Sequence, residues 1–135
     1  MVVTVGMYDA SLAHIGERLN GLGLNLNVLP FDKTGHFLVN GVEITPAEVD
    51  VDYLWLSSHI NADGAQKVAF DLALACKSIG VLQTFNAGLD NPAYKKISLK
   101  GTRICNSSAQ GVAIAEYVMA QVLSVTHPVA QQREQ

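Results

Sequence analysis

Two short segments of the chain carry side chains suited to binding a small anion. The first is Ser57-Ser58-His59, with two hydroxyls and an imidazole in a row, and the second is Asn86-Ala87-Gly88. Successive backbone N–H groups at a turn can form an anion-binding concavity, and a glycine lets a ligand approach the backbone without a Cβ in the way. An ordinary turn that needs a glycine explains the second segment equally well, and a simple loop histidine explains His59.

The other reactive side chains are dispersed along the chain and predict no metal site. No pair of histidines has the spacing of metal ligands, and we interpret His14 and His36 as surface residues. Cys76 and Cys105 fall at positions typical of small buried hydrophobic residues. Two cysteines provide no disulfide framework of the secreted kind, which favours a cytoplasmic protein with reduced thiols.

Length and charge exclude several classes of protein. The chain has 135 residues, a net charge of −3 and only 16% charged residues, which corresponds to one slightly acidic domain. Its nine basic residues are scattered rather than clustered, so a nucleic-acid surface is not expected. The apolar runs are shorter than the roughly 20 residues of a membrane span. The only Gly-x-Gly follows a predicted helix rather than a strand, which argues against a phosphate loop.

The elements that position these segments alternate between strand and helix. Buried-type strands are predicted near residues 2–7, 24–29, 53–57, 81–85 and 102–106, with helices near 11–22, 63–80 and 110–126 and a loop over 86–100. Asp9 or Ser11 is expected to cap the first helix, and Asn40-Gly41 predicts a hairpin insertion over 37–44. The alternation predicts an α/β, flavodoxin-like, doubly wound parallel sheet of order 2-1-3-4-5. Both anion-suited segments then lie at its carboxyl edge.

The second half of the chain resembles a known family. Residues 82–91, with Asn86-Ala87-Gly88-Leu89-Asp90-Asn91, are similar to a strand and loop in the substrate domain of D-isomer-specific 2-hydroxyacid dehydrogenases. Residues 101–108 resemble the short strand that follows in that family. Ile114-Ala115-Glu116-Tyr117-Val118 resembles its Ile-Ala-Glu helix. The order and spacing of the three motifs agree over residues 82–126.

The resemblance implies a substrate and a set of binding residues. The ligand would be a small 2-oxo or 2-hydroxy acid, with its carboxylate on the amides of Ala87 and Gly88. Ser57 and His59 stand where members that take phosphorylated substrates carry arginines, so an unphosphorylated acid is expected. The predicted substrate-binding residues are those of the two segments: Ser57, Ser58, His59, Asn86, Ala87 and Gly88. Gly111 replaces a threonine that many members have near the cofactor.

The resemblance also implies that parts of the enzyme lie elsewhere. Family members are more than twice as long and continue into a Rossmann domain that carries the NAD or NADP site and the catalytic arginine, glutamate and histidine. We therefore expect residues 1–127 to be a substrate-binding domain and residues 128–135 to lead towards that nucleotide domain. Such a fragment of an NAD(P)-dependent oxidoreductase, whether a natural truncation or an excised piece, would contain no catalytic residue and be inactive alone.

The last helix raises the question of partners. Residues 111–125 are apolar around most of the helix, which is typical of burial from several sides, so we expect a homodimer through this helix. Glu116 is interpreted as structural, at a cap or a domain boundary. The alternative function is a stand-alone flavodoxin-like module that binds a carboxylate or regulates a partner. A flavin electron carrier is disfavoured because Tyr8-Asp9-Ala10-Ser11 lacks a phosphate cradle.

Overall fold

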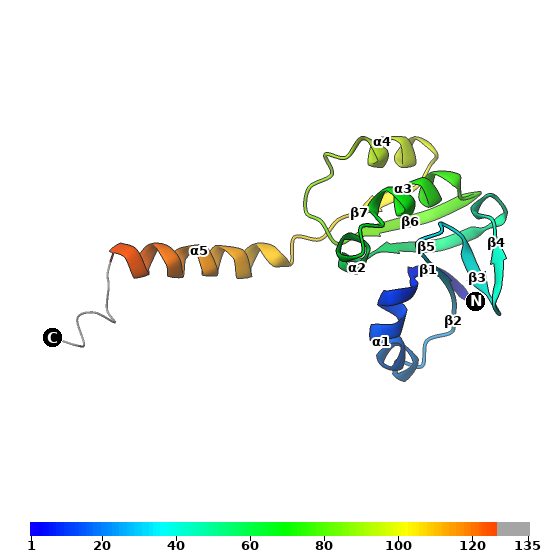
Figure 1. Cartoon of the computed structure of the whole chain (residues 1–135), viewed down its shortest axis with the longest axis horizontal. Coiled ribbons are helices and arrows are strands. Elements are labelled where there is room, and N and C mark those ends of the chain that lie inside the picture. Colours follow the sequence, from blue (N-terminus) through cyan, green and yellow to red (C-terminus); the bar gives the residue numbers. More distant parts are fainter. Residues whose placement is uncertain (127–135) are drawn as a thin grey trace.

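A single mixed sheet forms the centre of the domain. The computed structural model describes residues 1–126 and contains seven strands in the order β4-β3-β2-β1-β5-β6-β7 (Figure 1). The five parallel strands are β1 (Val3–Tyr8), β2 (Leu26–Phe31), β5 (Asp50–Leu56), β6 (Ser78–Thr84) and β7 (Arg103–Cys105). Counted along the chain, these five lie in the order second, first, third, fourth and fifth.

Helices flank the sheet on both faces, so the predicted doubly wound α/β class is confirmed. The helices α2 (Ser58–Ala62), α3 (Gln66–Ala75) and α4 (Pro92–Leu99) lie on one side, and α1 (Asp9–Gly21) lies on the other (Figure 1). A short 3₁₀ turn, η1 (Pro46–Glu48), precedes β5. The last helix, α5 (Gln110–Thr126), projects away from the domain.

The predicted hairpin is present as β3 (Phe37–Val39) and β4 (Val42–Ile44), which pair antiparallel at the edge of the sheet. Its two-residue turn has positive φ at both positions, 52° at Asn40 and 79° at Gly41. A type I′ turn requires this geometry, and asparagine followed by glycine tolerates it best. The local sequence therefore determines the turn.

The core lies between the sheet and the helices α3 and α4. Leu54 and Leu82, which have no exposed surface, belong to one cluster with Phe70 and Ile97 from these helices. Gly6 lies beneath this cluster, where a Cβ would come within 2.7 Å of Leu54 Cδ1. The absence of a side chain at this position lets the core side chains pack down onto β1.

Two element predictions were wrong. A helix, α4, lies within residues 86–100, where a loop was predicted, and Asn91 Oδ1 caps it by accepting a 2.9 Å hydrogen bond from the Ala93 N–H. The helix predicted over 63–80 is shorter and spans only Gln66–Ala75, while a separate short helix, α2, precedes it over Ser58–Ala62. Gly80 does not end a helix but lies in β6, where a Cβ would come within 2.8 Å of the Asp52 carbonyl oxygen.

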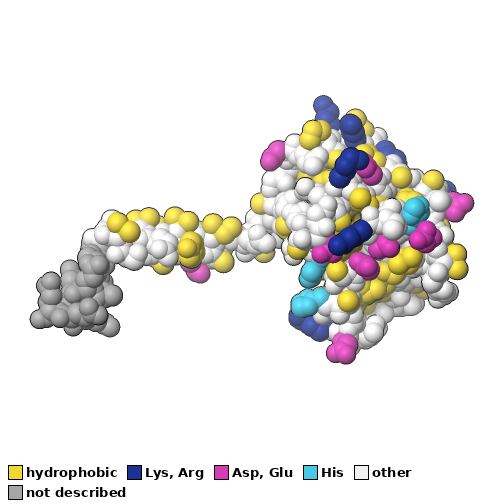
Figure 2. Space-filling view, viewed as in Figure 1, with side chains coloured by type: hydrophobic (Ala, Val, Ile, Leu, Met, Phe, Trp, Pro, Cys, Tyr) yellow, Lys and Arg dark blue, Asp and Glu magenta, His cyan; other side chains and the backbone are white. Residues whose placement is uncertain are grey.

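The helix predicted over 110–126 is confirmed, but its burial is not. Every residue of α5 is exposed, and Figure 2 shows hydrophobic side chains along its length. Glu116 is exposed as well and accepts no cap hydrogen bond within residues 1–126. The single chain leaves this helix uncovered, and its burial by another domain or a second copy stays a prediction. The predicted tail, residues 128–135, lies outside the described residues.

Candidate functional site

The two anion-suited segments follow neighbouring parallel strands. Ser57 comes directly after β5, and Asn86 lies two residues beyond the end of β6. β1 lies between β2 and β5 in the sheet, so the crossovers from β1 and β5 go to opposite faces here. Ligands of open α/β sheets bind outside the carboxyl ends of the strands at such a switch point.

A cluster of two buried hydroxyls and a partly buried imidazole lies at this switch point. The Oγ atoms of Ser11 and Ser57 are hydrogen-bonded to each other, and both residues are buried. Ser11 Oγ also lies 3.3 Å from His59 Nδ1. The ring centroid of His14 lies 5.5 Å from that of His59. The cluster joins the first turns of α1 and α2 across the crevice.

The cluster corrects the interpretation of three residues. Ser11 does not cap α1, since Tyr8 occupies the N-cap position and no side chain caps it. His14 is exposed, as predicted, but its ring contacts His59. Ser57 uses its hydroxyl inside the cluster, so Ser58 and His59 are the members of this segment that border solvent. The sequence contained no signal for this pairing, because Ser11 and Ser57 are 46 residues apart.

A second contact fixes the same edge of the sheet. Tyr8, at the end of β1, donates a 2.9 Å hydrogen bond to Asp63 Oδ2, just beyond α2. Burial, and then the hydrogen bond to Asp63, raise the pKa of Tyr8 well above its ordinary value. The phenol therefore stays neutral and donates. Lys33 Nζ lies 3.7 Å from the same carboxylate oxygen at the surface.

The loop after β6 is held by hydrogen bonds at its carbonyl groups. Asn106 Nδ2 donates to the Ala87 carbonyl at 2.7 Å, and the Ser107 N–H donates to the Asn86 carbonyl at 3.2 Å. Within residues 1–126, the backbone N–H groups of Ala87 and Gly88 donate to no protein acceptor, and both residues are exposed. The loop thus presents two free donors to solvent, which is the arrangement an anion site requires.

Asp90 lies against this loop and opposes anion binding. A Cβ on Gly88 would come within 3.0 Å of Asp90 Oδ1. Contact with this carboxylate is by itself a steric reason for a glycine at position 88, and it involves no ligand. This agrees with the ordinary-turn interpretation. It also places a negative charge beside the free amides, where like charge weakens the binding of a second carboxylate.

The space between the two segments is closed in this conformation. Ser57, Asn86 and Tyr94 line a cavity of about 10 Å³, which holds about one water molecule. A 2-oxo acid does not fit there. Binding at Ala87 and Gly88 therefore uses the outer, solvent-facing side of the loop or requires the two segments to separate.

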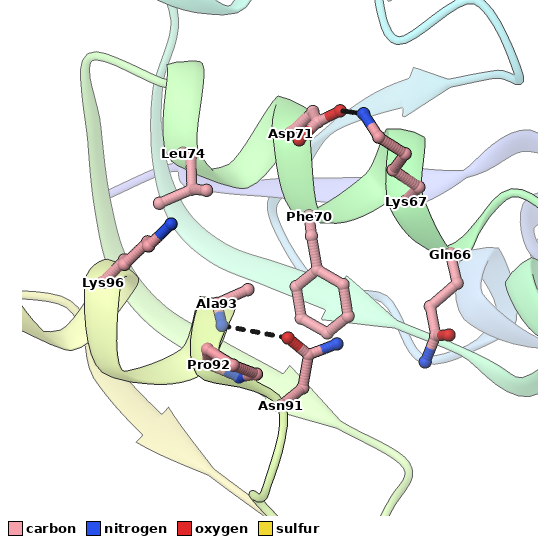
Figure 3. Close-up of a pocket in the computed structure, with 9 residues that line it drawn as sticks. All are labelled: Gln66, Lys67, Phe70, Asp71, Leu74, Asn91, Pro92, Ala93 and Lys96. Atoms are coloured by element: carbon pink, nitrogen blue, oxygen red, sulfur yellow. Dashed lines mark hydrogen bonds and ion pairs between the residues drawn. The ribbon is translucent and has the colours of Figure 1, made fainter.

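A larger groove, which sequence analysis did not single out, lies between α3 and α4. It has a volume of about 320 Å³, and its lining includes Phe70 and Pro92 (Figure 3). Lys67 and Asp71 pair on its rim at 2.6 Å, and Lys96 lies on its other side. One lysine remains beyond the ion pair, so the groove has little net charge. The groove forms between one face of α3 and the start of α4, and no local pattern predicts that these two helices lie side by side.

A dinucleotide does not fit the residues of the switch point. β1 leads directly into α1 with no glycine at the junction, and the first residue of α1 is Asp9, whose Oδ1 accepts a 2.6 Å hydrogen bond from the Ala10 N–H. A phosphate needs a free helix N-terminus without a competing anion. In the described part of the chain, no three histidine, cysteine, aspartate or glutamate side chains are grouped as metal ligands. Among residues 1–126, no helix has the length and apolar character that a membrane crossing requires.

The fold and site define a doubly wound α/β domain with exposed backbone donors at the carboxyl edge of its sheet. Searches of protein-family models, of curated proteins and of solved structures found no match for this chain.

Proposed function

We propose that this chain is the substrate-binding domain of an NAD(P)-dependent D-2-hydroxyacid dehydrogenase and binds the carboxylate of a small 2-oxo or 2-hydroxy acid. The observation that supports this is the pair of free backbone N–H groups at Ala87 and Gly88, held beyond β6 by bonds to Asn106 and Ser107. The motif resemblance over residues 82–126 supports the same substrate class.

In this proposal the chain binds and orients the acid. The two amides donate to its carboxylate, and Asn86 borders the same turn. Ser58 and His59, at the end of the neighbouring strand, contact the rest of a small substrate. Hydride transfer needs a general acid–base and a nicotinamide cofactor. We assign neither role to a residue of this chain, so a second domain supplies both.

Backbone amide NMR of the 135-residue chain tests the substrate. Titration with glyoxylate or pyruvate should shift the Ala87 and Gly88 resonances, whereas the uncharged lactamide should not. No shift at millimolar acid would remove the site. The chain alone should oxidise no NADH in the presence of these acids, and measurable turnover would contradict the assignment of catalysis to a second domain.

A stand-alone carboxylate-binding or regulatory module is the second candidate. The closed core formed by the sheet with α3 and α4 favours it, because this core needs no other domain to exclude water. Micromolar binding of a small acid by the isolated chain would support the module. Millimolar binding that tightens on addition of a nucleotide-binding domain would support the dehydrogenase.

Two further proposals concern the surroundings of the chain. We place it in the cytoplasm, because Cys76 and Cys105 are both unpaired thiols and free thiols persist in reducing compartments. We also propose a homodimer through residues 111–125, supported by the exposed apolar surface of α5. Sedimentation should then give twice the 14.5 kDa of one chain. We propose no nucleic-acid partner.

A further inference from the structure

One face of the sheet is open over three of its strands. Leu54 and Leu82 face the core under α3 and α4. Since side chains alternate along a strand, Tyr53 and Val81 point to the opposite face. In the described part of the chain, α1 is the helix on that face, and it packs chiefly against β1 and β2 (Figure 1). Tyr53 is accordingly 47% exposed.

The open face is uncharged over β5 and β6. Strand register places Tyr53 beside Val81 and Trp55 beside Gln83, and on β7 it places Arg103 beside Val81 and Cys105 beside Gln83. Tyr53 and Arg103 are exposed, and the other four side chains are partly buried. This surface, defined by Tyr53, Trp55, Val81, Gln83, Arg103 and Cys105, carries a single charge, at its β7 edge, and its remaining composition is that of a helix-packing face.

The helix α5 has a matching apolar half. At 100° per residue, its large apolar side chains gather on one side, Gln110 and Ser124 lie on the other, and Gln121 lies at one edge between them. Glu116, its one charged residue, falls at the edge of the apolar half. The members of this half are between 48% and 81% exposed and comprise Val112, Ile114, Val118, Met119, Val122, Leu123 and Val125.

The connection from β7 holds α5 away from its own sheet. Asn106 and Ser107 are bonded to the loop after β6, and the Gly111 N–H donates to the Ser108 carbonyl at 2.9 Å. These bonds start the helix in the direction that Figure 1 shows, pointing away from the domain. The open face and the apolar helix of one chain are therefore separated by an ordered connection.

We propose that α5 of one copy packs on the open face of a second copy, over β5, β6 and β7, and that the exchange is reciprocal. This inference rests on the homodimer proposed above and names the surface that the helix covers. Reciprocal exchange closes a two-fold dimer, so no further surface remains to continue the assembly. A 17-residue helix is about 25 Å long and about 10 Å wide. Two such contacts, counted on both surfaces, cover on the order of 1,000 Å² in flat projection, close to the lower limit of stable interfaces.

Cross-linking through a native thiol tests the arrangement. Cys105 belongs to the open face, whereas Cys76 is only 1% exposed. Val112→Cys or Met119→Cys places a second thiol on the apolar half of α5, and Ser124→Cys places one on the polar half as the matched control. With a short bismaleimide, the first two variants should give covalent dimers that disappear when Cys105→Ser is added. The control variant should stay monomeric on a denaturing gel.

Other positions of α5 would give different cross-linked products. A covalent dimer that persists with Cys105→Ser means that two α5 helices pair with each other, and an internal cross-link within one chain means that α5 folds back onto its own sheet. Either result, or no cross-link from Val112→Cys and Met119→Cys, overturns the inference but leaves the homodimer in place if sedimentation still gives a dimer.

A charge on the open face provides an independent measurement. Tyr53→Lys should weaken dimerisation at least tenfold in sedimentation, while the fold, checked by circular dichroism, is kept because position 53 is half-exposed. The matched variant Ser124→Lys, on the polar half of α5, should leave the dimer unchanged. Dimerisation that is insensitive to Tyr53→Lys overturns the inference. A chain that is monomeric at all concentrations would overturn both the proposed homodimer and the proposed helix exchange. The amide titration at Ala87 and Gly88 tests the carboxylate site separately and does not depend on either result.

Discussion

The phenol of Tyr8 donates a 2.9 Å hydrogen bond to the Asp63 carboxylate, 55 residues further along the chain. The contact joins the end of β1 to the turn after α2, across the point where the helices change face. Tyr8 has no exposed surface, whereas the Asp63 side chain is 34% exposed and near Lys33. One end of the bond is therefore in the core and the other at the surface of the candidate site.

Tyr8→Phe should lower the free energy of unfolding by about 1 kcal/mol, the typical net value of one hydrogen bond. The loss is modest because Asp63 keeps water and Lys33 as partners. Urea denaturation measures it, with Tyr53→Phe as the exposed control that should change nothing. An equal loss in both variants would show that the bond to Asp63 contributes nothing specific.

The same tyrosine predicts a pH dependence. Its pKa is raised in the folded chain by burial and by Asp63, so its contribution to stability is complete below the ordinary tyrosine pKa of about 10. That contribution is lost as pH rises above this value, because folding then disfavours the ionised phenol. Unfolding free energy measured from pH 8 to 11 should fall in the native chain and fall less steeply in Tyr8→Phe. Identical slopes would contradict the assignment.

Gly80→Ala should destabilise the fold by about 1–3 kcal/mol, as overpacking does, because its Cβ would meet a backbone oxygen 2.8 Å away on the adjacent strand. Gly111→Ala is the matched control, since nothing lies within 4 Å of the added methyl group. It should raise the helix content of α5, where alanine is favoured over glycine by about 1 kcal/mol. Thermal and urea unfolding compare the two, and a harmless Gly80→Ala would refute the close approach of β5 and β6.

Asp90→Asn should tighten the binding of glyoxylate or pyruvate several-fold. The substitution removes a negative charge beside the Ala87 and Gly88 amides, and like charges about 4 Å apart cost about 1 kcal/mol in water. The amide titration measures the affinity, with Asp71→Asn on α3 as a control of equal charge change. If the two variants bind equally, or Asp90→Asn binds more weakly, the acid does not lie on this loop.

The two thiols should differ in reactivity. Burial raises the pKa of Cys76 to about 11, so at pH 8 roughly a thousandth of it is thiolate, the reactive form. Cys105 is only partly buried. In the dissociated chain, a thiol reagent at pH 8 should therefore modify Cys105 first and Cys76 only on unfolding. Mass spectrometry identifies the site, and fast modification of Cys76 would contradict its placement in the core.

Local patterns were sufficient where one segment determines its own conformation. The Asn40-Gly41 hairpin and the helix over 110–126 are present as predicted, since turn geometry and helix formation depend on neighbouring residues. The missed helix α4 also had a local signal, because Asn91 and Pro92 are favoured N-cap and first-turn residues. The error at Gly80 had no such signal, since a glycine marks a helix end and a close strand contact equally well.

The sequence by itself determined the doubly wound class, the strand ends that carry the two segments, and the apolar nature of the last helix. Only the tertiary structure decided that Ser11 pairs with Ser57, that Tyr8 reaches Asp63, and that Asp90 covers Gly88. The first two depend on the relative positions of elements more than 40 residues apart, and the third depends on the path of one loop. The periodicity of a sequence shows which residues share one side of a helix or strand. A site forms where several elements meet, and only their packing sets the distances between side chains of different elements.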